Sequence, residues 1–195
     1  MRGIALVAIG LVLVACLLVP DSCTPAATEP DVEAKGPGLT PEEEEQMAEW
    51  GVINVDNVDD ASRIAGFPVA EPAYIPEGFS GGSFSVSRLG ARLPEEMRPK
   101  FVQINVQRIW SWEGNRKVMF VLIQSQHKFG IGGGEPAEIC GRQGERTFSE
   151  AEADRPARLS LGWEDNGNYF SLSGMLAGSL DEETLEKIAC SVKVE

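Results

Sequence analysis

The sequence contains one histidine, His127, among 195 residues. Zinc sites built from several histidines are therefore excluded, and any Ser-His-Asp arrangement would depend on this residue alone. His127 follows a predicted strand beside Lys128, where a solvated side chain is expected. The adjacent acid pairs Glu95-Glu96 and Glu182-Glu183 point in different directions and make poor partners for acid-base chemistry. We therefore expect a protein that is not an enzyme and that needs no cofactor or metal.

Basic residues are also scarce. Seventeen Lys and Arg residues against thirty Asp and Glu residues give a net charge of −13 at pH 7. Nucleic-acid binding requires a basic face, so nucleic acid is not an expected partner. The acids are concentrated in residues 24–79, which is typical of a solvated, self-repelling arm. A glycine-rich stretch at 130–134 lacks the Lys-Ser/Thr pair of a phosphate-binding loop, and Pro136 follows too soon for a helix.

The N-terminus has the composition of an export signal. Arg2 precedes an uncharged apolar run from Gly3 to Val19. Within it, residues 13–16 (Leu-Val-Ala-Cys) resemble a bacterial lipobox, in which Cys16 would become the lipidated N-terminus. The apolar run continues past Cys16, so an uncleaved membrane anchor and a cleaved soluble form are alternatives. All three place the remaining chain outside the cytoplasm, and the first two attach it to a membrane.

The order of segments indicates one domain on a tether. Residues 1–19 are assigned to the signal peptide or anchor, 20–56 to a flexible acidic tether, and 57–195 to an α+β domain. Within the tether, Thr40 and Glu43 form a capping-box pattern that predicts a short helix over 41–50. A second helix is expected over Val58–Ala65, after Asn57 and before Gly66.

Alternating apolar residues predict a series of strands. The expected strands are Gly82–Leu89, Pro99–Trp110, Lys117–Gln126, Pro136–Cys140 and Glu145–Phe148. Lys117–Gln126 is apolar on both faces, which is typical of a central strand. Three prolines between Phe67 and Phe79 forbid a helix or a central strand, so this segment is expected to wrap the edge of its own core.

The C-terminal stretch predicts a hairpin followed by a helix. Asn166-Gly167 favours a two-residue turn, because both central positions need positive φ. The turn fixes a register that pairs Trp163 with Phe170, Leu161 with Leu172 and Leu159 with Gly174. Ser179, with Glu182 three residues on, predicts the start of a helix. Its apolar stripe should cover the sheet; the stripe consists of Leu180, Leu185, Ile188 and Ala189.

Two cysteines of the domain are placed to pair. Cys140 ends a predicted strand and Cys190 ends the closing helix, in a chain expected in an oxidising compartment. The link would be worth about 3–4 kcal/mol by loop entropy. The alternative is two buried free thiols. Cys23 lies in the tether, where pairing with a core strand costs chain entropy.

Several segments together resemble a known family. They are residues 65–69 (AGFPV), 72–79 (PAYIPEGF), the hairpin parts 161–163 (LGW) and 169–172 (YFSL), and the helix 185–193 (LEKIACSVK). Their order resembles a bacterial extracytoplasmic domain of unknown function, found at the C-termini of anti-sigma-like and sporulation-related membrane proteins. That family is similar to the LolA/RseB-like fold. The resemblance implies a curved antiparallel half-barrel covered by helices, with no catalytic residue.

The resemblance implies two functions. The first is binding of a lipid or acylated peptide in the concave face of the sheet. The groove would be lined by Trp110, Val118, Phe120, Leu122, Trp163 and Phe170. The second is a protein–protein sensor or regulator of envelope signalling, which would use the Tyr74–Phe79 edge or the Arg-rich region 88–117. An open apolar groove beside Trp110 favours the first function, and a sheet face filled by the protein's own helix favours the second.

Overall fold

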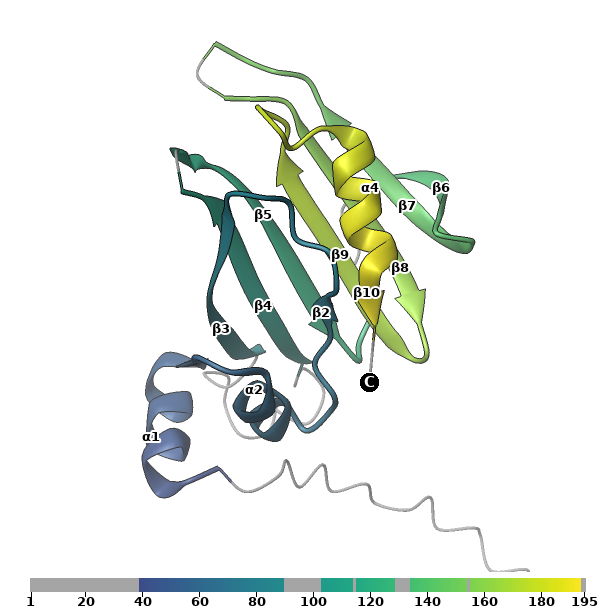
Figure 1. The fold of residues 1–195 in the computed structure, drawn as a ribbon. Coiled ribbons are helices and arrows are strands. Elements are labelled where there is room, and N and C mark those ends of the chain that lie inside the picture. The colour runs from purple at the N-terminus through teal and green to yellow at the C-terminus, as the bar shows by residue number, and fades with distance from the viewer. Residues whose placement is uncertain (1–38, 90–102, 114, 129–133, 154, 194–195) are drawn as a thin grey trace, which may run out of the picture. The chain divides into compact units, whose positions relative to one another are not determined.

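The computed structural model describes residues 39–89, 103–113, 115–128, 134–153 and 155–193 (Figure 1). They belong to one compact unit. The centre is an antiparallel eight-stranded sheet with the strand order β1-β3-β4-β5-β9-β8-β7-β6. The strands are β1 (Val52–Val55), β3 (Phe79–Leu89), β4 (Gln103–Trp112), β5 (Asn115–Ser125), β6 (Glu135–Ile139), β7 (Arg142–Ser149), β8 (Arg158–Asp165) and β9 (Asn168–Met175).

The C-terminal hairpin forms as predicted. Asn166 and Gly167 have φ values of 50° and 75°, the left-handed conformation that a tight hairpin turn requires. The resulting register pairs Trp163 with Phe170, and their rings stack with centroids 5.3 Å apart. The predicted pairs of Leu161 with Leu172 and Leu159 with Gly174 are also present. The turn thereby sets the inward face of two adjacent strands.

Two short helices precede the sheet strands in the chain. Helix α1 (Pro41–Trp50) begins with the predicted capping box between Thr40 and Glu43. Helix α2 (Val58–Ala65) is capped by Asn57 and ends at Gly66. Glu43 also pairs with Arg63 at 2.7 Å, which joins the two helices. This pairing, with the cap, lowers the pKa of Glu43 to about 2.

The closing helix starts later than the sequence predicted. Helix α4 (Glu182–Ser191) is capped by Asp181, whose carboxylate accepts from the backbone of Thr184, and not by Ser179. The reason is local: Ala177 and Leu180 exchange backbone hydrogen bonds, so Ser179 lies within a closed turn. The predicted packing of the helix on the sheet is confirmed, since its apolar stripe is fully buried.

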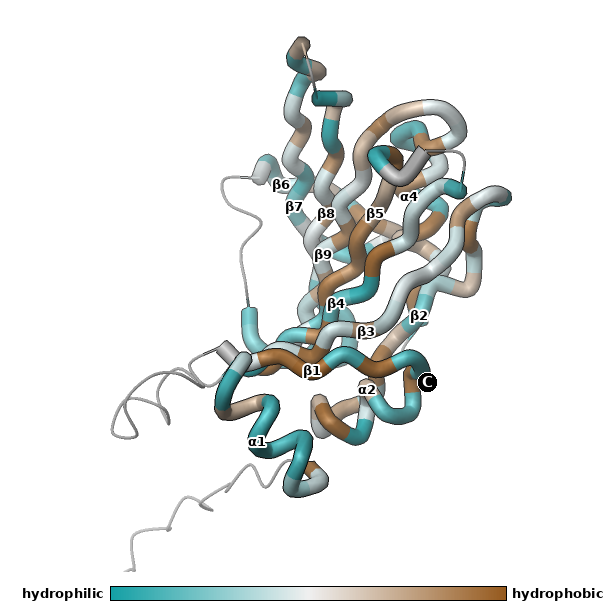
Figure 2. Tube along the Cα trace, turned by 90° about the vertical axis from the view of Figure 1, so that its left-hand side faces the viewer, coloured by the Kyte–Doolittle hydropathy of each residue, from teal (hydrophilic) through white to brown (hydrophobic). Residues whose placement is uncertain are grey.

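Within the described residues, α2 and α4 pack on one face of the sheet, and α1 contacts the edge strand β1. Figure 2 shows α4 and β2 (Glu71–Pro72) on the same side of the strands. A first core cluster lies beneath α4 and a second lies beneath α1 and α2. The segment Phe67–Phe79 crosses this face, and β2 within it pairs with β10 (Val192–Lys193). Arg108 holds the segment through an ion pair with Glu71. The α+β class with an antiparallel sheet is confirmed.

The folded part of the chain begins earlier than the sequence predicted. Val52–Val55, which the sequence assigned to the tether, forms edge strand β1 and pairs with β3. Ile53 is buried there, and Met47 of α1 is buried in the same cluster. The folded part therefore includes residues 40–56. Strand β1 was not predicted from the sequence, because four residues between two helices are too few to show a recognisable period of two.

The two cysteines meet as predicted. Cys140 and Cys190 form a disulfide with their Cα atoms 5.3 Å apart. The bond joins the C-terminal end of α4 to the β6–β7 turn, in which Cys140 has a φ of 55°. It therefore fastens the covering helix to the edge of the sheet opposite β1.

Candidate functional site

The covered face of the sheet does not carry the predicted groove. The six side chains expected to line it are 0–7% exposed and belong to the core cluster beneath α4: Trp110, Val118, Phe120, Leu122, Trp163 and Phe170. Helix α4 and the segment Phe67–Phe79 fill the space above them. This corrects the expectation of an open groove, and the reason is that the apolar face finds its cover within the same chain.

The opposite face of the sheet, called the uncovered face below, carries a candidate site. Within the described ranges, no helix lies on this face (Figure 2). Side chains that alternate with the core residues point to it, since the strand period is two. Its centre is an apolar patch on β4 and β5, in which Ile109 is 39% exposed and the others are half-buried. The patch consists of Ile109, Met119, Val121 and Ile123.

Small polar side chains continue this surface across the next three strands. Register aligns Val121 with Ser173, Ser173 with Ser160, and Ser160 with Thr147. The hydroxyls of Ser160 and Ser173 lie 2.7 Å apart in a hydrogen bond. The row therefore presents short side chains whose polarity is partly satisfied within the sheet, although Ser160 is only 8% exposed.

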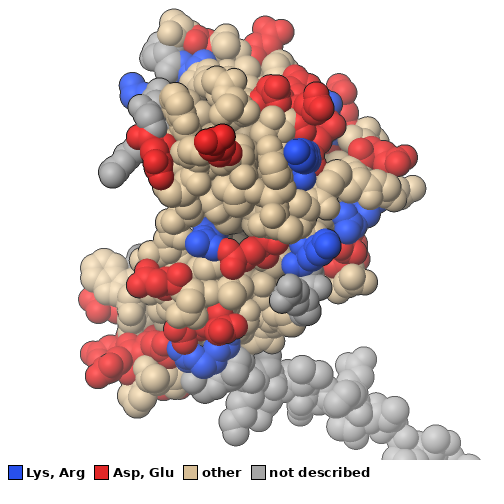
Figure 3. Space-filling model, viewed as in Figure 1, with Lys and Arg blue, Asp and Glu red and all other residues tan. Residues whose placement is uncertain are grey.

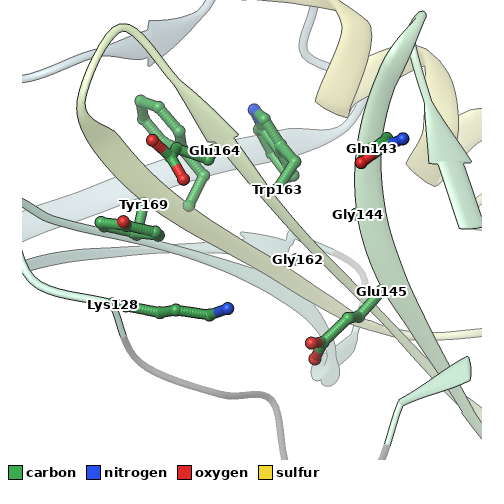
Figure 4. A pocket seen from close by; sticks show the side chains of 9 residues that line it. Lys128, Gln143, Gly144, Glu145, Gly162, Trp163, Glu164 and Tyr169 are labelled. Atoms are coloured by element: carbon green, nitrogen blue, oxygen red, sulfur yellow. The ribbon is translucent and has the colours of Figure 1, made fainter. Parts of the chain in front are cut away.

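A pocket opens beside this row, above Gly162 (Figure 4). Its volume is about 280 Å³. Register places Gly162 between Ser171 on β9 and Glu145 on β7, so the missing side chain leaves a hollow in the surface. The remaining lining includes the acid Glu164, the phenol of Tyr169 and the amine of Lys128. Strands β7, β8 and β9 therefore supply the floor and walls.

The pocket is lined by two carboxylates. Glu145 and Glu164 come from neighbouring strands, and Lys128 follows β5. Burial raises the pKa of Tyr169, and the charge and hydrogen bond of Glu164 raise it further. The phenol therefore stays protonated at neutral pH and can donate a hydrogen bond. The arrangement suits a cationic group better than an anionic one.

Arg158 and Lys117 are cations on the same surface outside the pocket. Arg158 starts β8, pairs with Met175 and Ser149, and is exposed. It points to the same face as Ser160 and Gly162, because these residues are separated by two and four positions. The uncovered face is therefore acidic near Gly162 and basic at the opposite end of β8.

The other residues singled out from sequence do not join this site. His127 is exposed and follows β5. Among the described residues, no group of three His, Cys, Asp or Glu side chains could hold a metal ion. Cys16 lies outside the described residues, as do residues 90–102 and 114 of the Arg-rich region 88–117.

Sequence reasoning missed the uncovered face. Its pocket depends on the register of three strands, and the β7–β8 alignment is not fixed by a short turn motif. The isolated glycine at 162 within an alternating strand was the available signal, since such a glycine often marks close approach by another group.

The covered side of the sheet has its own cluster of acidic side chains, at helix α1. Acidic side chains gather over α1 (Figure 3), whose first turn contains Glu42, Glu43 and Glu44. These acids favour the positive end of the helix dipole. Their position at a helix start gives them a structural role.

None of the helices in the described part of the chain is long and apolar enough to cross a membrane. Comparisons of the chain with protein-family models, curated proteins and solved structures found no match.

Proposed function

We propose that this protein is a membrane-tethered, extracytoplasmic and non-enzymatic domain that binds a protein partner through the uncovered face of its sheet. One observation carries the proposal: the chain itself buries most of the apolar side of the sheet, with Phe148 exposed on β7, yet Ile109 is 39% exposed on the other side. An exposed apolar patch rimmed by polar residues is typical of a protein interaction site.

The composition of the face supports a protein partner. The centre is apolar through Ile109, Val121 and Ile123, and charged side chains lie farther out, which is the usual anatomy of an interface. The acid-lined pocket above Gly162 adds a position for one cationic side chain. A lipid chain would gain little from the serine row, because hydroxyls offer no apolar contact.

The location is inferred from the N-terminus and the disulfide. The Cys16 pattern supports a lipid anchor, and the Cys140–Cys190 bond is of the kind that persists in oxidising compartments. A tethered domain with a binding face could act as a sensor or regulator at the envelope, the second function that the family resemblance implies.

Binding of a hydrophobic ligand on the covered face is energetically disfavoured. A ligand would have to displace Leu185 and Ile188, both fully buried. Exposing such side chains costs about 1.5–3 kcal/mol each. The disulfide at the end of α4 also opposes the required movement.

A photo-crosslinking amino acid at Ile109, in the full chain within its membrane, tests the proposal. Glu183 on α4 is the matched control, because it is exposed on the covered side. We expect a discrete protein adduct from position 109, lost on Val121→Lys, and none from position 183. Adducts with lipid alone, or equal adducts at both positions, would refute the proposed face.

A further inference from the structure

We infer that the partner is a second copy of this chain, packed face to face so that Arg158 of each copy enters the pocket above Gly162 of the other. This inference rests on the proposed function and names its partner. Three features of the uncovered face carry it: the spacing along β8, the opposite charges at its two ends, and its short central side chains.

The spacing is symmetric about Ser160. Gly162 lies two residues to one side of it, and Arg158 lies two residues to the other. A two-fold axis between the sheets, running above the Ser160–Ser173 row and across the strands, exchanges these two positions. Each Arg158 then lies over the other copy's Gly162. Two residues of a strand span about 7 Å. Arg158 and Gly162 are therefore equally far from the axis, and a single two-fold rotation forms both Arg158–pocket contacts.

Sheets packed face to face are usually rotated by about 30°. At about 7 Å from the axis, this rotation displaces the facing positions by only about 3–4 Å. An arginine side chain is long and flexible enough to follow, so the twist of the sheets preserves the contact. A two-fold axis also guarantees that the same surface serves both copies.

The charges are complementary under this rotation. The Arg158 guanidinium of one copy would contact Glu145 and Glu164 in the pocket of the other. Lys128 also lines this pocket, but it follows β5 and lies on that side of the pocket. Arginine presents several N–H donors in a planar fork that matches carboxylates. The alternative rotation, with the axis along the strands, would bring the acidic ends of the two copies together and is disfavoured.

The centre of the face permits close packing. Ser160, Ser173 and Thr147 are short, but Ser160 is only 8% exposed and the Thr147 hydroxyl is buried. Contact at the centre therefore comes mainly from Ile109 and Val121. Five strands at about 4.8 Å spacing and six residues in length cover on the order of 500 Å² per copy. This is the size of a weak interface. Confinement of both copies to a membrane would raise their effective concentration.

Charge reversal on the full chain in detergent micelles tests the inference, with dimer fraction measured by native mass spectrometry over a concentration series. We expect concentration-dependent dimers of the wild type. Arg158→Glu should weaken dimerisation at least tenfold, and so should the double variant Glu145→Arg/Glu164→Arg. An equimolar mixture of these two variants should restore dimers, because each heterodimer then contains two opposite-charge contacts.

Arg155→Glu is the control, since it makes the same charge change at an exposed residue between β7 and β8. Circular dichroism should show that every variant melts like the wild type. A monomeric wild type, a dimer that survives Arg158→Glu, or mixing without rescue would each overturn the inference. A crosslink from position 109 to a different protein would overturn the dimer inference while supporting the proposed function. Absence of any protein crosslink would contradict both the inference and the proposed function.

Discussion

The side chain of Gln124 holds the backbone of Ala70, fifty-four residues away, in the middle of the covered face. The Ala70 N–H donates to Gln124 Oε1 over 2.8 Å. Gln124 Nε2 donates to the Pro68 carbonyl at 2.8 Å and to Asn168 Oδ1 at 3.1 Å. This buried amide therefore fixes the crossing segment Phe67–Phe79 to β5 and β9, between the two core clusters.

Gln124→Met should destabilise the fold by about 2–3 kcal/mol, because it leaves the buried groups of Ala70 and Pro68 without partners. Urea unfolding followed by circular dichroism measures the change. Gln143→Met, at an exposed position of β7, is the control and should cost less than about 0.5 kcal/mol. Equal stability of the two variants would show that the amide does not hold the segment.

Loss of the disulfide should also be measurable. Fifty residues separate Cys140 from Cys190, and the loop-entropy model gives about 4 kcal/mol for that length. We expect Cys140→Ser/Cys190→Ser to unfold at lower urea than the oxidised wild type. Reduced wild type should match the double variant. If oxidised and reduced wild type unfold at the same urea concentration, the bond has no stabilising role.

Acid should weaken the contact between α1 and α2. The Arg63 partner and the Thr40 cap lower the pKa of Glu43 from 4.5 to about 2. A lowered folded-state pKa stabilises the fold above the unfolded pKa, and this contribution is lost as pH falls from about 4.5 towards 2. Arg63 is 36% exposed, so solvent screening limits the contribution to about 1 kcal/mol.

Glu43→Gln should therefore destabilise the protein at pH 7 and have little effect at pH 2. Glu44→Gln, one residue further along α1, should show a smaller pH dependence. Chemical unfolding at several pH values measures both variants. A constant difference between Glu43→Gln and wild type across this range would contradict the assigned pKa.

Local signals in the sequence predicted much of this fold. The Asn166-Gly167 turn set the hairpin register because two adjacent residues determine it. Thr40, Asn57 and Gly66 set helix ends through contacts within one turn. The prediction that Ser179 caps the last helix was wrong, because a backbone turn closed by Leu180 competes with capping. The two alternatives differ little in sequence.

The candidate site was less predictable because it depends on distant contacts. The six expected groove residues were correctly identified as inward-facing, yet sequence alone did not reveal that α4 and residues 67–79 would cover them. The pocket above Gly162 requires β7, β8 and β9 in one register. Periodicity assigns Gly162 to a face, but not to the neighbours Glu145 and Ser171.

Methionine oxidation in intact membranes tests the central claim most directly. Met119 and Met175 are partly exposed on strands of the uncovered face, whereas Met47 is 5% exposed in the core. Peptide mass spectrometry after a brief peroxide pulse compares the full chain in its membrane with the same chain diluted in detergent. A partner on this face predicts slower oxidation of Met119 and Met175 in the membrane, with Met47 slow in both. Equal oxidation of Met119 in the two samples would contradict the claim.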